Sequence, residues 1–182
     1  MNKHLNWLFR ILFLLNIGAI FFLTFQSRAD TLAMSKQVRD ITAQTVAGSA
    51  EAASAAWWYN LKNFRQLAHL PEYFALGCTG LLAVRTFRAA DMPFGRRRRG
   101  GAPAEYSRAG RLLLHCVYAW VCCLGVSCLD QACKHFLPTR EFSLGDMGFD
   151  LLGYTCGILA VCGGLKLWEI WAAHKMRKGN YS

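Results

Sequence analysis

The 182-residue sequence lacks the motifs that mark several common enzyme classes. It has no Gly-x-Ser-x-Gly motif, which removes the usual sequence argument for a serine hydrolase. Neither its histidines nor its cysteines have the paired spacing of a metal site, so we expect no metal and no other cofactor. No internal repeat is present either. The sequence is instead rich in hydrophobic residues, which make up 54% of it.

These apolar residues are gathered into four long runs. Each run has roughly the 17 to 25 residues that a helix needs to cross about 30 Å of hydrocarbon. The runs are continuous rather than amphipathic, which argues against a soluble bundle, and lipid requires their backbones to be helical. We therefore predict an all-α integral membrane bundle that forms one domain over residues 1–182. Its transmembrane helices are expected over residues 5–25, 69–88, 111–129 and 149–171.

Basic residues are unevenly distributed between the connections. The loop over residues 89–110 is rich in arginine and the tail over residues 172–182 is also basic, whereas the last loop carries only Lys134 and Arg140. By the positive-inside rule, both termini and the arginine-rich loop are cytoplasmic. The net charge of +10 needs no nucleic-acid partner, because no aromatic platform accompanies the arginines at 96–99. Contact with anionic lipid explains that run.

The connection over residues 27–68 has apolar residues at three- and four-residue steps. This spacing predicts one or two amphipathic helices on the outer membrane surface, with a break at Gly48. A hairpin that packs on the bundle outside the membrane is the alternative. The first apolar run also resembles a signal peptide with a cleavage site before Asp30, but its length favours a retained helix. We expect the second membrane helix to begin near Pro71.

Ionisable and polar residues gather at the predicted outer ends of the helices. They form either a salt-bridge network that fixes the outer loop or a polar pocket open to the outer leaflet. In a pocket, Arg65 and Arg140 would be the anion-binding pair, because the planar guanidinium matches phosphate and carboxylate. The spacing of Gly153 and Gly157 favours close helix contact. The candidate site residues are Arg65, His69, Glu72, Tyr73, Asp130, Lys134, Arg140, Ser143, Asp146 and Asp150.

Most of the cysteines lie inside the apolar runs, where a thiol serves as a small hydrophobe. Only Cys128 and Cys133 lie near the predicted outer face. A disulfide between them is left open.

Several segments of this chain resemble the VanZ-like family of bacterial membrane proteins. The resemblance rests on Phe25-Gln26-Ser27, on Arg65 to His69 with Glu72-Tyr73 and Leu76-Gly77, and on Asp130-Gln131 with Phe136, Pro138, Arg140, Ser143, Asp146, Asp150, Gly153 and Gly157. The family usually has glutamate where Gln131 stands and glutamine where Lys134 stands. These departures make the loop less acidic. This weakens the hypothesis of acid/base catalysis by paired carboxylates and favours binding of an anion.

The resemblance implies a multi-pass protein of the bacterial inner membrane. Family members are linked to reduced susceptibility to the lipoglycopeptide teicoplanin, which targets cell-wall precursors at the outer face. Membrane lipids are the expected partners, together with an anionic lipid carrier or cell-wall precursor. A homo-oligomer remains open.

Three functions are compatible with the sequence. The first is a non-enzymatic protein that engages an anionic head group. The second is an enzyme acting on a lipid phosphate or amide, with His69 and either Asp130 or Asp146 as the acid/base pair. The third is a small lipid flippase. The lack of charge at the centres of the last three membrane helices argues against it. No catalytic residue is assigned.

Overall fold

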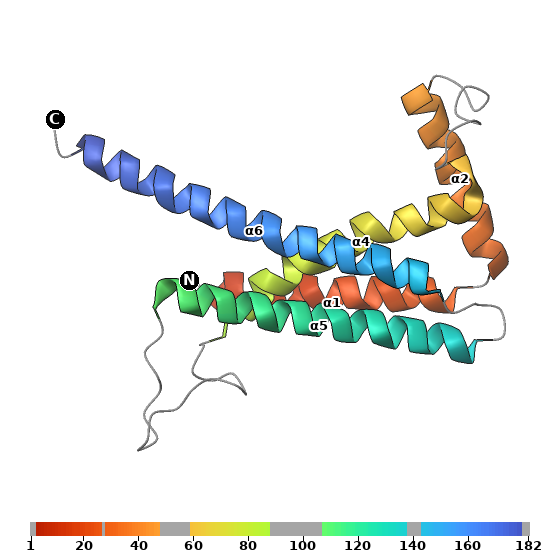
Figure 1. The fold of residues 1–182 in the computed structure, drawn as a ribbon, viewed down its shortest axis with the longest axis horizontal. Helices are drawn as coiled ribbons and strands as arrows, with labels where there is room; N and C mark the ends of the chain where they lie inside the picture. The colour runs from red at the N-terminus through yellow and green to blue at the C-terminus, as the bar shows by residue number, and fades with distance from the viewer. Residues whose placement is uncertain (1–2, 27, 48–58, 88–106, 138–142, 180–182) are drawn as a thin grey trace, which may run out of the picture.

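The structure is a computed structural model that describes residues 3–26, 28–47, 59–87, 107–137 and 143–179. Within these ranges the regular structure is helical and contains no strand, which confirms the predicted fold class (Figure 1). The α-helices are α1 (Lys3–Phe25), α2 (Arg28–Ala47), α4 (Leu61–Val84), α5 (Arg108–Phe136) and α6 (Leu144–Gly179).

The surface of the bundle is suited to lipid. The segments long and apolar enough to cross a membrane are Lys3–Phe25, Gln66–Val84, Arg108–Phe136 and Leu144–Ala172. Large hydrophobic side chains point away from the protein on these segments, for example Phe22 on α1, Leu113 on α5 and Leu159 on α6. Such a surface would be an aggregation hazard in water but is the expected one in hydrocarbon. The chain is therefore a multi-pass membrane protein.

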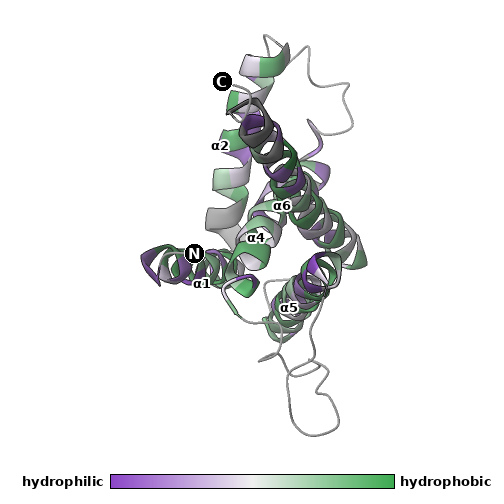
Figure 2. Ribbon diagram, turned by 90° about the vertical axis from the view of Figure 1, so that its left-hand side faces the viewer, coloured by the Kyte–Doolittle hydropathy of each residue, from purple (hydrophilic) through white to green (hydrophobic). Residues whose placement is uncertain are grey.

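Helix α4 occupies the centre of the bundle. Figure 2, which views the molecule end-on, shows α4 between α1, α5 and α6, and α4 packs against each of them. The apolar core includes Ile20 of α1, Leu76 of α4, Cys123 of α5 and Tyr154 of α6. Successive membrane helices run in opposite directions, so the ends of α1 and α5 meet the beginnings of α4 and α6 (Figure 1). We call this the Asp150 end of the bundle.

The beginning of α4 differs from the sequence prediction. We expected a helix start near Pro71, but α4 begins at Leu61 and continues through the proline. Proline removes one backbone donor from a helix, and in membranes neighbouring groups make up for this loss. Pro71 is exposed, so its ring does not disturb the packing against the other helices. Because the helix is continuous here, it carries His69 and Glu72 at regular spacing into the bundle.

Helix α2 follows α1 with only residues 26 and 27 between them and ends just before Gly48. It packs against α4, its Ala43 is fully buried, and the guanidinium carbon of Arg39 lies 4.5 Å from the ring centre of Tyr59. The predicted helical connection is thus present over residues 28–47. Residues 48–58 lie outside the described part of the chain.

Three glycines set the close approach of α4 to α6. A side chain on Gly77 of α4 would overlap the backbone of Tyr154, and one on Gly157 of α6 would overlap the carbonyl oxygen of Phe74. A Cβ atom on Gly153 would lie only 2.7 Å from the carbonyl oxygen of Leu70. The two backbones are therefore in direct contact along this interface. This contact brings His69 of α4 alongside Asp150 of α6.

Helix α6 is the longest element and continues beyond its packing partners (Figure 1). Its last turns expose Trp168 and Trp171, whose ring centres lie 5.0 Å apart. The ammonium of Lys175 lies 5.4 Å from the Trp171 ring. Aromatic and basic residues in this order are typical of the boundary between hydrocarbon and water.

All eight cysteines are free thiols, including Cys128 and Cys133. The sulfur atoms of Cys116 and Cys162 lie 3.1 Å apart and join α5 to α6.

Candidate functional site

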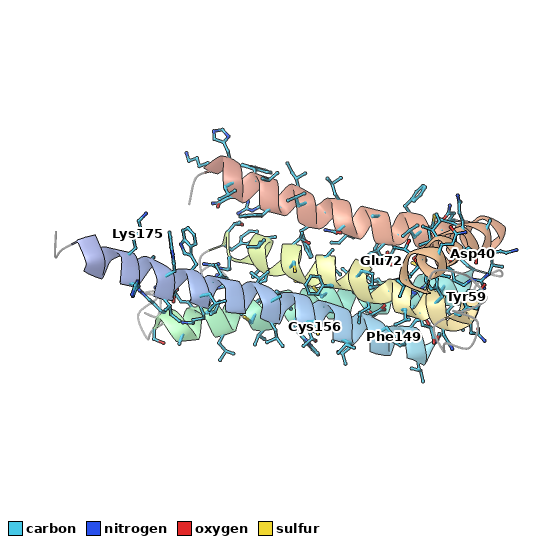
Figure 3. All side chains as sticks on the ribbon, turned by 90° about the horizontal axis from the view of Figure 1, so that it is seen from above. Asp40, Tyr59, Glu72, Phe149, Cys156 and Lys175 are labelled. Carbon is cyan, nitrogen blue, oxygen red and sulfur yellow. The ribbon has the colours of Figure 1, made fainter. Side chains whose placement is uncertain are left out.

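A polar cluster is built at the Asp150 end from four helices. The antiparallel arrangement brings together residues that are up to 126 positions apart in the sequence, from Thr24 to Asp150. Figure 3 shows Glu72 of α4 toward the same end of the bundle as Asp40 and Tyr59, while Lys175 lies at the opposite end. The polar cluster consists of Thr24, His69, Glu72, Tyr73, Ser127, Asp130, Gln131, Lys134, Asp146 and Asp150.

Asp130 organises the first half of the polar cluster and is 1% exposed. Lys134, one turn further along α5, places Nζ 2.7 Å from Asp130 Oδ2. The hydroxyl of Thr24 donates to the other carboxylate oxygen, and Gln131 Nε2 lies 3.5 Å from Oδ2. A buried carboxylate is tolerated only when it is paired in this way. The contacts tie α1 to α5.

Asp150 organises the second half and is fully buried. The Ser127 hydroxyl of α5 donates to Asp150 Oδ2 at 2.7 Å. On the other side, His69 Nδ1 of α4 lies 3.1 Å from Asp150 Oδ1, in a close contact without the alignment of a hydrogen bond. Asp150 therefore joins α6 to both α4 and α5.

Asp146 lies one turn before Asp150 and is more exposed. Its Oδ2 lies 3.7 Å from His69 Nε2, beyond the length of a hydrogen bond. Its backbone N–H donates to Ser143 Oγ at 3.3 Å, which gives α6 a serine cap at its first turn. The backbone N–H of Ser143 in turn lies 3.5 Å from Gln131 Oε1, so the start of α6 is tied to α5.

Glu72 and Tyr73 complete the polar cluster. Glu72 is half-buried, close to His69, and makes no ion pair or hydrogen bond with any described residue. Tyr73 is fully buried beside His69, with ring centres 6.1 Å apart. Its hydroxyl lies next to Ser127, whose own hydroxyl donates to Asp150.

Most of the residues singled out in the sequence meet in this region. The structure brings together His69, Glu72, Tyr73, Asp130, Lys134, Ser143, Asp146 and Asp150. The side chain of Arg65 and the whole of Arg140 lie outside the described part of the chain, and so does the anion-binding pair they were expected to form. His69 contacts Asp146 and Asp150, whereas the acid/base hypothesis had paired it with Asp130 or Asp146.

Sequence reasoning missed Thr24 and Ser127, which supply the hydroxyl donors to the two buried aspartates. Ser127 could have been found from its spacing, because it shares a helical face with Asp130 and Lys134. Thr24 carries no comparable signal, since it lies on a different helix and has no charge.

The charge of the polar cluster is unbalanced. Among the described residues, four carboxylates, on Glu72, Asp130, Asp146 and Asp150, face one lysine and one histidine, and the histidine is cationic only when protonated. No three His, Cys, Asp or Glu side chains among the described residues are placed to hold a metal ion. The arrangement can share protons between acids and an imidazole, or it can hold a cationic group at Glu72.

Comparison with known proteins gives no relative. No family model, no curated protein and no solved structure matches this chain.

Proposed function

We propose that the chain is a VanZ-like protein of the bacterial inner membrane that binds the head group of an anionic envelope lipid or cell-wall precursor. The proposal is carried by the convergence of ionisable side chains from three helices, α4, α5 and α6, at one end of a membrane bundle, where Thr24 of α1 joins them. Charges in spanning segments are costly, at about 2.5 to 3.5 kcal/mol each near the helix centre, and usually mark function. An effect on glycopeptide susceptibility belongs to the same proposal.

In this proposal the Asp150 end faces outward and both termini are cytoplasmic. The opposite end of the bundle supports this orientation because it is basic. Arg10 donates from Nε to Thr86 Oγ1 at 2.8 Å and lies 4.2 Å from the Phe87 ring centre. Helix α5 begins there with Arg108 and Arg111. Short basic segments of this kind are retained on the cytoplasmic side.

The phosphate contact is assigned to Arg65, Arg140 and His69. Arg65 precedes His69 by one turn of α4, and Arg140 precedes Ser143 by three residues in the sequence. A guanidinium binds phosphate through two parallel N–H bonds, which gives both affinity and orientation. Asp130 and Lys134 already neutralise each other, so their pair need not open to admit the anion.

Native mass spectrometry of the protein released gently from its own membranes tests this assignment. We expect a defined anionic lipid on the unmodified protein and at least about tenfold less of it on an Arg65→Ala/Arg140→Ala variant, because each charge-assisted hydrogen bond contributes about 1.5 to 3 kcal/mol. Arg108→Ala/Arg111→Ala removes the same charge at the opposite end and should keep the lipid. Equal lipid on all three proteins, or no selective lipid on any, would contradict the proposal.

One observation favours a second candidate, an enzyme that acts on a lipid phosphate or amide. Asp150 Oδ1 lies 3.1 Å from Nδ1 of His69, and Nε2 lies 3.7 Å from the more exposed Asp146 without bonding to it. A histidine oriented by a buried aspartate can serve as a general base, which is worth about 10² to 10⁴ in rate. Turnover of envelope lipids that falls by this factor in His69→Gln, but not in Lys166→Met, would support it. Absence of turnover in the unmodified protein would reject it.

A further inference from the structure

Helix α2 carries a row of apolar side chains that the described part of the chain leaves exposed. Met34, Val38 and Ile41 are 42%, 48% and 56% exposed. They recur at steps of four and three residues, so they share one face of the helix. Ala43, which is fully buried, lies on the opposite face. Helix α2 therefore packs by one face and presents a second, apolar face outward. We call the row formed by Met34, Val38 and Ile41 the α2 stripe.

The charged residues beside the α2 stripe point away from it. Lys36, Arg39 and Asp40 each lie one or two positions from members of the stripe, and side chains at that spacing do not share a face of a helix. Arg39 and Asp40 also pair with each other at 2.8 Å. The stripe therefore has no charge on its own face. An apolar environment requires this, because burying an unpaired charge is costly.

Helix α2 runs across the axis of the bundle rather than along it. Figures 1 and 2 both show this crossing, and Figure 1 shows α2 at the Asp150 end. Because the membrane helices follow the membrane normal, a helix at this angle lies parallel to the membrane surface. Its level is set by α1, whose apolar span ends at Phe25, three residues before Arg28. Tyr59, an interfacial residue type, lies against Arg39 at the same level. Helix α2 is thus placed at the boundary between hydrocarbon and water.

We propose that the α2 stripe is sunk in the lipid of the leaflet at the Asp150 end, so that α2 is an interfacial anchor. The lipid-facing surface of α1 leads directly to it, because Phe22 and Phe25 are exposed at the end of that helix. The anchor holds the end of α1, and with it the contact from Thr24 to Asp130, at a fixed depth in the bilayer. This inference does not depend on the ligand of the polar cluster.

Photo-crosslinking of the full chain tests the α2 stripe. The photoreactive residue p-benzoylphenylalanine is placed at Val38, Lys36 or Leu113, and each protein is reconstituted into vesicles of phosphatidylethanolamine and phosphatidylglycerol. Under light its ketone inserts into a neighbouring C–H bond, so contact with lipid adds the mass of one phospholipid. Leu113 is the positive control because it is exposed on a membrane-spanning segment. Lys36 is the matched control because it is exposed on α2 but lies off the stripe. Thermal unfolding checks that all three proteins are folded.

We expect the added phospholipid mass at Val38 and Leu113 and its absence at Lys36. A covalent dimer through Val38 would show that a second copy covers the stripe, and a link to residues 48–58 would show that this chain does; either result overturns the proposal. Equal lipid at Val38 and Lys36 overturns it too, and so does an unmodified Val38 protein beside a modified Leu113 protein. None of these outcomes bears on the head-group function, which the Arg65→Ala/Arg140→Ala comparison tests.

Discussion

Gly157→Ala is expected to lower the stability of the bundle by about 3 kcal/mol, the upper end for overpacking a close-packed interior. The added methyl group would overlap the carbonyl oxygen of Phe74, which is backbone and cannot move aside by changing a rotamer. Helices α4 and α6 would therefore have to separate. Because this interface also sets the distance between His69 and Asp150, the polar cluster should loosen with it.

Thermal unfolding in detergent measures this effect, and α6 supplies a matched control. Gly163 lies on the same helix, but nothing lies within 4 Å of a methyl group added there. Gly163→Ala should be neutral or slightly stabilising, because alanine is favoured over glycine in helices by about 1 kcal/mol. If Gly157→Ala and Gly163→Ala unfold at the same temperature, α4 and α6 do not pack as described.

Lys134→Met is expected to cost about 3 to 5 kcal/mol, the range for removing one partner of a buried ion pair. The methionine fills similar volume but leaves Asp130 without a cation at a site that is almost inaccessible to solvent. The hydroxyl of Thr24 still donates to Asp130, but it brings no charge. Denaturation by heat or by a denaturing detergent should show the loss.

Two further variants make this prediction specific. Lys166→Met breaks an ion pair with Glu169 in which both side chains are more than half exposed, so its effect should stay within about 0.5 kcal/mol. Asp130→Leu/Lys134→Met removes both charges together and should recover much of the stability lost in Lys134→Met. If Lys134→Met were as mild as Lys166→Met, Asp130 and Lys134 would not form a buried pair.

The membrane helices could be predicted from the sequence because hydrocarbon imposes a length and an apolar composition on each span. The same reasoning placed the last helix well, since α6 passes through the whole expected range of 149–171. It failed at the start of α4, where Pro71 was given more weight than the polar turns before it. Proline costs a helix one backbone hydrogen bond, but packing against the surrounding bundle can offset this loss. The sequence of one segment does not show whether such packing is present.

For the polar cluster, the sequence indicated which charged residues share an end but not which of them pair. The depth of a residue in the membrane follows from its position relative to an apolar run, so His69, Asp130 and Asp150 could be placed at the same end of the bundle. Their partners depend on how the helices are rotated and how closely they approach, which is set here by the glycine contacts between α4 and α6. The hydroxyl donors Thr24 and Ser127 carry no charge, so charge patterning could not reveal them.

The length of α6 makes the protein sensitive to the thickness of its bilayer. At about 1.5 Å of rise per residue, the helix from Asp150 to Trp168 is about 27 Å long, close to the roughly 30 Å of the hydrocarbon layer. With the tryptophan pair anchored at one boundary, a thicker bilayer draws Asp150 and its partners away from water, and a thinner one exposes them. The acyl-chain length of the lipids thereby controls the access of water to the polar cluster through hydrophobic mismatch.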